Sequence, residues 1–126
     1  MAFVAITMVA IISMAALSID IGTLYEAKAE AQRAADAAAL AAAQVISTSG
    51  ITGDPTNSSS SWQPACGGTS SSATLAAVSV AQQNLIAGTA APTSNIHVYY
   101  GTNAGVGTST TCIGQTAFGV NPVVEV

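Results

Sequence analysis

Charge is what this sequence has least of. Only 6% of its 126 residues are charged, whereas about a quarter are charged in an ordinary globular domain. Half of the residues are hydrophobic and the mean hydropathy is +0.52, so the low charge does not indicate disorder. A soluble monomer with so few charges is poorly protected against association. The composition is therefore typical of a protein that associates with lipid or with copies of itself.

Basic residues are the scarcest of all, since Lys28 and Arg33 are the only two. The net charge is −4 and the isoelectric point is about 4.3. Two cations cannot neutralise a useful number of phosphates, and this excludes nucleic acid as a partner.

Residues that build metal centres and catalytic sites are also rare. Cys66 and Cys112 are far apart in sequence and form no CxxC motif, and with His97 as the single histidine a structural zinc site would lack ligands. We therefore expect no metal and no cofactor. In an exported chain the two cysteines are expected to form one disulfide, and two free buried thiols are the alternative.

The sequence shows no nucleophile, base and orienting group in a recognisable arrangement. His97 lies in a strand-like pattern, where a solvent-facing side chain is expected, and the serines of residues 58–61 have no Gly-x-Ser-x-Gly context. We predict that the protein is not an enzyme.

The first nineteen residues carry no charge at all: MAFVAITMVAIISMAALSI. As a helix they span about 28 Å, close to the roughly 30 Å core of a bilayer. A cleavable signal peptide would begin with basic residues and end at a break in structure, and neither is seen. We predict a membrane-length helix whose basic leader has been removed, so that Met1 lies near the mature start. An ordinary bitopic anchor is the alternative, and a buried core helix is disfavoured because little of the chain remains to surround it.

The apolar run continues without a break into an alanine-rich, charged segment. Residues 20–44 contain no proline and one glycine, and alanine is the best helix former. Glu30, Arg33 and Asp36 are spaced to share one face, where opposite charges can pair. One helix is therefore predicted over about residues 2–47, roughly 65–70 Å long. The chain contains no second predicted helix of equal length to pack along it, so its partners are expected to be other copies.

The segment IDIGTLYEAKAEAQRAADAAALAAA resembles the N-terminal signature of the TadE/TadG-like proteins of tight-adherence (Tad, Flp-type) pilus systems. That family shows an apolar run, an Ile-Asp-x-Gly-x-Leu-Tyr element and a Gln-x-Ala-Ala-Asp-Ala-Ala-Ala-Leu-Ala block. The matching positions are Asp20, Gly22, Leu24, Tyr25, Gln32, Ala34, Ala35, Asp36, Ala37, Ala38, Ala39, Leu40 and Ala41.

The resemblance implies a pilin-like α+β fold, export, a membrane stage and a role in surface filaments. The implied partners are the inner membrane before assembly, a prepilin peptidase and the pilus assembly machinery. The chain departs from type IV pilins, which carry a glutamate early in the apolar run, because it has Ala5 there and no glutamate before Glu26.

The remainder, residues 48–126, is predicted to be a small extracellular α+β head behind the N-terminal helix domain, residues 1–47. Residues 47–72 are a loop by composition, residues 73–88 a second helix that ends at Gly88, and residues 95–101 and 121–126 strands. Leu75, Val78 and Leu85 are expected to pack the second helix on the first. Residues 102–119 read as a loop. The resemblance includes a similar second helix and strands, more weakly.

Residues 57–59, Asn-Ser-Ser, match the N-glycosylation pattern, and the serine run could carry O-linked sugar. An unmodified polar loop is at least as well supported. The candidate sites are Asn57, Ser58, Ser59, Ser60 and Ser61.

The main functional hypothesis is a structural subunit that polymerises through its N-terminal helix into a helical pilus for surface adhesion. The alternative is a membrane-anchored accessory protein of pilus assembly that never polymerises. A lipid-anchored adhesin is disfavoured because no lipobox cysteine lies near the start. The residues expected in the filament core are Phe3, Val4, Ile6, Val9, Ile11, Ile12 and Leu17.

Asp20 is the charged residue closest to this apolar run. A carboxylate buried there would need a cation, and Lys28 and Arg33 lie about 12 and 20 Å further along the same helix. Its partner is therefore expected on a neighbouring copy, where the amino group of Met1 is favoured over Lys28. A hydrated position without a partner is the alternative.

Overall fold

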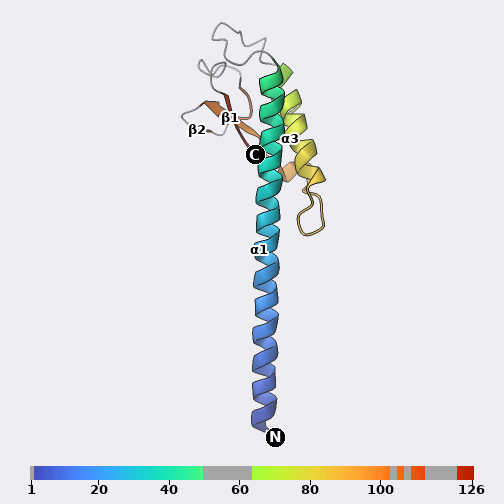
Figure 1. Cartoon of the computed structure of the whole chain (residues 1–126), viewed down its shortest axis with the longest axis vertical. Helices are drawn as coiled ribbons and strands as arrows, with labels where there is room; N and C mark the ends of the chain where they lie inside the picture. The colour runs from blue at the N-terminus through green and yellow to red at the C-terminus, as the bar shows by residue number, and fades with distance from the viewer. Residues whose placement is uncertain (1, 50–63, 103–104, 107–108, 113–121) are drawn as a thin grey trace.

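A computed structural model of the chain describes residues 2–49, 64–102, 105–106, 109–112 and 122–126. The elements are α1 (Ala2–Thr48), α3 (Ser72–Gln83), a 3₁₀ turn (Thr93–Asn95), β1 (Tyr99–Thr102), β2 (Gly105–Val106) and β3 (Pro122–Glu125). Figure 1 shows α1 running the full length of the molecule, with α3 and the strands gathered beside its C-terminal end. This confirms the predicted α+β fold with a long N-terminal apolar helix.

The helix α1 forms over the predicted span and ends one residue later, at Thr48. Its interior has no proline, and a Cβ built on its only glycine, Gly22, would meet nothing within 4 Å. The helix ends in a Ser-Thr-Ser run. The hydroxyls of Ser47 and Thr48 donate to the carbonyl of Gln44, and the hydroxyl of Ser49 donates to Ile46. These side-chain bonds add to the backbone hydrogen bonds of the last turn, where the N–H of Ser49 also donates to the carbonyls of Val45 and Ile46.

Alanines make the interface between α1 and α3. Ala38 and Ala42 of α1 are fully buried, as are Ala73 and Ala77 of α3. A methyl side chain lets two helices approach closely, so this packing gains contact area without large side chains. The rest of the buried cluster is formed by Ile46, Ala65, Ala81, Val98, Tyr100 and the two cysteines. The C-terminal part of α1 thus forms one side of the head's core.

The fit of these alanines yields a testable prediction. Replacing Ala38 with leucine is expected to destabilise the head by about 1–3 kcal/mol, because the added side chain would be forced into a filled interface. Ala43, which is exposed on the same helix, offers the matched control, and Ala43→Leu should change the unfolding free energy very little. Chemical denaturation of the full chain in detergent measures both. Equal stabilities for the two variants would contradict this packing.

The second helix differs from its prediction in length and in buried face. It ends at Gln83, because Asn84 leaves the helical conformation and its side-chain amide donates to the carbonyl of Val80 at 2.8 Å. Such local side-chain bonds compete with continued helix. The residues that pack on α1 are alanines, whereas Leu75 and Leu85 are 56% and 54% exposed. Of the three predicted contacts, only Val78 packs against the core.

The sheet has three antiparallel strands in the order β2-β1-β3. Tyr100 lies opposite Val124, and Gly101 lies opposite both Val106 and Val123. The C-terminal strand appears where predicted. The strand predicted from residue 95 begins only at Tyr99, since the segment after Pro92 forms the 3₁₀ turn. The short strand β2 was missed inside the predicted loop, because Gly105 and Val106 pair only through their contact with β1.

Candidate assembly surface

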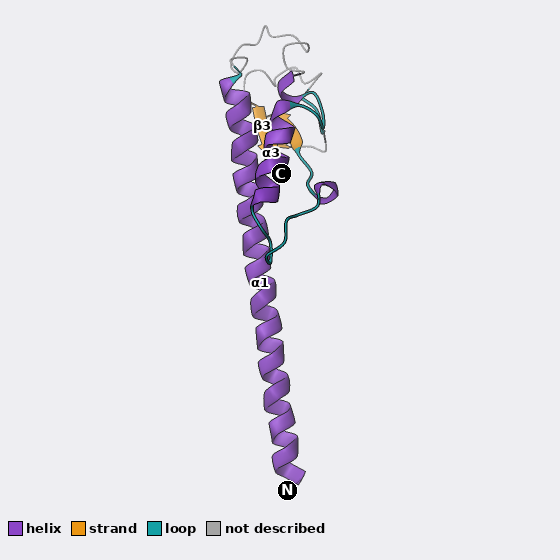
Figure 2. Cartoon of the chain, turned by 90° about the vertical axis from the view of Figure 1, so that its right-hand side faces the viewer, coloured by secondary structure: helices purple, strands orange, loops and turns teal. Residues whose placement is uncertain are grey.

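The N-terminal half of α1 has no cover within the described chain. Every residue from 3 to 26 is exposed, and Figures 1 and 2 show this part of the helix projecting away from the head. We call residues 3–21 the apolar segment. A contiguous exposed apolar surface of this extent marks a membrane or protein interaction site. Its large exposed side chains are Phe3, Val4, Ile6, Met8, Val9, Ile11, Ile12, Met14, Leu17, Ile19 and Ile21.

Two of the polar interruptions in the apolar segment are satisfied within the helix. The hydroxyl of Thr7 donates to the carbonyls of Phe3 and Val4, at 3.1 and 2.9 Å, and that of Ser13 donates to Val9 at 2.8 Å. A hydroxyl bonded back to its own helix needs no water, so it can enter a dry environment. The helix is long and apolar enough to cross a membrane, by length and composition.

The seven residues predicted to form a filament core all lie on the apolar segment. Their exposed fractions run from 60% for Leu17 to 85% for Phe3. The head packs only on the C-terminal part of α1, so these side chains keep their whole apolar area for an external partner. Their packing between copies stays a prediction.

The charged residues predicted to act between subunits lie just beyond this segment. Asp20 and Lys28 are exposed, and Asp20 stands between Ile19 and Ile21, which are 66% and 47% exposed. A carboxylate in this setting lies at the edge of a membrane-length apolar stretch. Met1, the other predicted partner of Asp20, lies outside the described residues.

Glu30 makes a contact that the sequence did not reveal. Its Oε2 accepts a hydrogen bond of 2.7 Å from the backbone N–H of Ala87. Ala87 and Gly88 both have positive φ, 49° and 77°, between the paired residues Ile86 and Thr89, as in a tight hairpin turn of type I′. The spacing of Glu30, Arg33 and Asp36 suggested pairing along one face of the helix, but the hydrogen-bond donor to Glu30 lies 57 residues away in the chain. The Gly88 expected to stop the helix instead completes this turn.

We predict that Glu30→Ala loosens the turn at Ile86–Thr89. The variant removes the acceptor of the Ala87 N–H, and water then competes for that amide, so hydrogen exchange there should accelerate about fivefold, as for loss of one exposed charged hydrogen bond. Glu26→Ala is the matched control on the same helix, since Glu26 is exposed one turn away. Unchanged exchange at Ala87 in the Glu30 variant would rule the contact out.

A disulfide joins Cys66 to Cys112, with 5.6 Å between their Cα atoms. The backbone N–H of Cys112 also donates to the carbonyl of Cys66 at 3.0 Å. Nearby, the Tyr100 hydroxyl is hydrogen-bonded to Thr74 at 2.7 Å, and burial raises the pKa of Tyr100 above its ordinary value. The bridge and this buried pair tie the loops of the head to α3 and the sheet.

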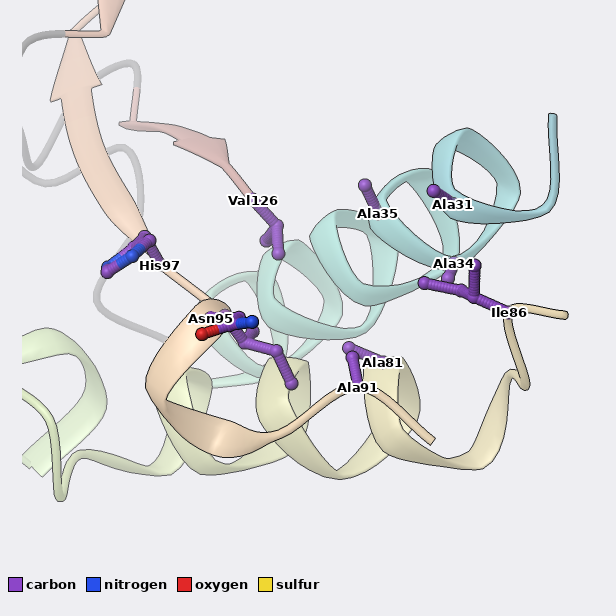
Figure 3. A pocket seen from close by; sticks show the side chains of 10 residues that line it. Ala31, Ala34, Ala35, Ala81, Ile86, Ala91, Asn95, His97 and Val126 are labelled. Carbon is purple, nitrogen blue, oxygen red and sulfur yellow. The ribbon is translucent and has the colours of Figure 1, made fainter. Parts of the chain in front are cut away.

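An apolar groove of about 210 Å³ lies between α1, α3 and residues 91–97, and Ile86 and Val126 also line it. Figure 3 shows alanines from both helices along it, with His97 and Asn95 at one end. His97 is exposed, as predicted, and its ring stacks on Tyr99 with 6.2 Å between centroids. Among the described residues, no three His, Cys, Asp or Glu side chains gather as metal ligands.

The candidate glycosylation residues, Asn57 and Ser58 to Ser61, lie outside the described residues.

Comparison with known proteins finds a family match for the N-terminal part of the chain. Residues 1–45 match the family model described as "Putative Flp pilus-assembly TadE/G-like". The match covers the apolar segment and the charged alanine block, about a third of the chain, and the resemblance seen in the sequence is confirmed there. No curated protein and no solved structure matches the chain.

Proposed function

We propose that this protein, which carries a Tad pilus-associated N-terminal segment, is a structural subunit that polymerises through α1 into an extracellular filament. The observation that carries the proposal is the exposure of every residue from 3 to 26 on a helix continuous with the head's core. In this proposal the apolar segment first anchors the chain in the inner membrane and then packs against the same segment of neighbouring copies.

Energetics support packing between copies. A fully buried Val, Ile, Leu or Phe side chain contributes about 1.5–3 kcal/mol, so the seven predicted core residues together far outweigh the few tenths from exposed ion pairs. In the C-terminal half, the half-buried Ala37 and Ala39 and the exposed Ala43 would let neighbouring helices approach closely as well. The head, held by its disulfide and its alanine interface, would form the outer surface of the filament and meet the adhesion target.

Export and assembly follow from the same proposal. A prepilin peptidase would remove a leader, and the pilus assembly machinery would draw subunits from the membrane into the filament. The protein is proposed to act as a building unit and an adhesive surface, without catalysis.

An accessory role in pilus assembly is the second candidate. It is favoured by the length and hydropathy of α1, which suit a permanent membrane span, and it requires no contact between copies. After cells are sheared, a filament subunit is expected in the released material, whereas an accessory protein is expected to stay with the membranes.

The test is shearing of producing cells, followed by electron microscopy of the released material with antibody against the head. Gold-labelled filaments containing the chain are expected. Recovery of the chain only with membranes, and unlabelled filaments, would instead establish the accessory role.

A further inference from the structure

We propose that the turn after α3, residues 85–90, contacts the lipid headgroups beside α1 while the apolar segment spans the membrane. We call these residues the Ala87 turn. The inference rests on the membrane stage of the proposed function, which the filament subunit and the accessory protein share. It gives the head its own contact with the bilayer, separate from the insertion of α1.

The Ala87 turn is the part of the head nearest to the apolar segment. Figures 1 and 2 show α3 running back along α1, and the chain that follows α3 forms the end of the head that faces the N-terminal half of the helix. The hydrogen bond from the N–H of Ala87 to Glu30 holds the turn at that level of α1. Ile86 is half-buried and lines the groove together with Ala31 and Ala34, so the turn is held on two sides.

Distances along α1 place this level at the membrane surface. Glu30 lies about 13.5 Å beyond Ile21 at the α-helical rise. Between them, Leu24 and Tyr25 are 71% and 69% exposed, and a tyrosine ring is typical of the headgroup level. From Tyr25 to Glu30 the helix rises about 7.5 Å, and the headgroup layer on each side of a bilayer is about 5–7.5 Å thick. The Ala87 turn therefore lies at the outer boundary of the headgroups, and the usual helix tilt of about 20° brings one side of the molecule closer to them.

The tip of the turn is apolar against the preference of the turn itself. Ala87 has a φ of 49° and Gly88 a φ of 77°, and a type I′ turn favours Asn, Asp or Gly at the first position because a Cβ disfavours positive φ. Ala87 and Ala90 are nevertheless exposed, and Leu85 is 54% exposed. An apolar side chain at an exposed position where turn chemistry favours a polar one indicates a contact outside the chain.

The surroundings of the turn favour lipid as that contact. The turn faces along α1 toward a helix segment of membrane length, so the bilayer that receives this segment is the first surface the turn meets. Residues 84–98 contain no Asp, Glu, Lys or Arg, so the contact takes no charge of this stretch out of water. The carboxylates of Glu26 and Glu30 nearby favour zwitterionic headgroups over anionic ones.

Two leucines of nearly equal exposure allow a matched test. Leu85→Trp is compared with Leu75→Trp, whose leucine is 56% exposed near the other end of α3, both in a Trp62→Phe background because Trp62 is the only tryptophan. The full chains are placed in phosphatidylcholine vesicles that contain a lipid with a nitroxide on its headgroup, a short-range quencher. We expect the label to remove most of the fluorescence of the Leu85→Trp chain and little of that of the Leu75→Trp chain. Equal quenching of the two would overturn the contact.

The same chains show whether a second copy covers the turn instead. In that case the fluorescence of the Leu85→Trp chain would depend on the protein-to-lipid ratio in unlabelled vesicles and would not respond to the headgroup label, which would overturn the lipid contact. Adding Ala90→Glu to the Leu85→Trp chain should lower the quenching toward the level of Leu75→Trp, because a carboxylate stays in water. Unchanged quenching in this double variant would also count against the contact.

Vesicle flotation of the unmodified chain separates this inference from the membrane stage on which it rests. A chain that does not float with vesicles would overturn the membrane stage, and the turn contact with it. A chain that floats but whose turn is not quenched would overturn the turn contact alone.

Discussion

Replacing Ile12 with aspartate is expected to abolish filament formation while the head stays folded. Ile12 is 66% exposed in the single chain, so the change costs the head nothing. In a filament core it would exchange about 1.5–3 kcal/mol of burial for an unpaired carboxylate in a dry environment. The effect would recur in every subunit. Electron microscopy of sheared material measures filament yield, and hydrogen exchange of α3 reports the state of the head.

Membrane insertion must be separated from assembly in this experiment, because a central aspartate also disfavours insertion. Ile12→Ala keeps the segment apolar and removes most of the side chain, so it should insert normally and lower the yield to an intermediate level. Membrane fractionation checks insertion for both variants. Normal filaments from the inserted Ile12→Asp chain would exclude a packed core around this residue.

Loss of the disulfide should have the largest effect on the head. The bridge spans 46 residues of sequence, and closing such a loop stabilises a fold by about 4 kcal/mol in the chain-entropy model. Cys66 and Cys112 are both buried, so the double alanine variant is a suitable test and leaves no free thiol. We expect faster proteolysis of residues beyond α1 and a lower unfolding midpoint, measured on the full chain in detergent.

The same variant should leave helix packing between copies largely intact, because the bridge lies in the head and the apolar segment lies outside it. Under reducing conditions the heads of intact filaments should therefore become protease-sensitive before the filaments come apart. Filaments that dissolve as soon as the bridge is reduced would show that the head, rather than α1, holds the copies together. Two free thiols in native material would show that the disulfide does not form.

The sequence predicted the long helix well because its signal is local and strong. An uncharged run followed by an alanine-rich block without proline leaves no competing structure, and α1 ends within one residue of the expected position. The disulfide was expected because the chain contains only two cysteines. The C-terminal strand was recognisable because valines dominate it.

The errors concern features that depend on contacts distant in sequence. The face of α3 that packs on α1 is formed by Ala73, Ala77 and Ala81, and alanine in an alanine-rich sequence is a weaker signal of burial than leucine. Leucine at positions 75 and 85 suggested another face, since large apolar side chains are usually the buried ones. The hydrogen bond from Ala87 to Glu30 joins two segments that carry no common motif. Pairing of β2 likewise depends on the neighbouring strand.

The most direct test of the account is a helical reconstruction of filaments sheared from producing cells. The account predicts that the density is built from this chain, with α1 of each copy continuous from the head into the centre and residues 3–21 packed among neighbouring copies. Filaments whose core is built from a different protein, with this chain recovered only in the membrane, would contradict it.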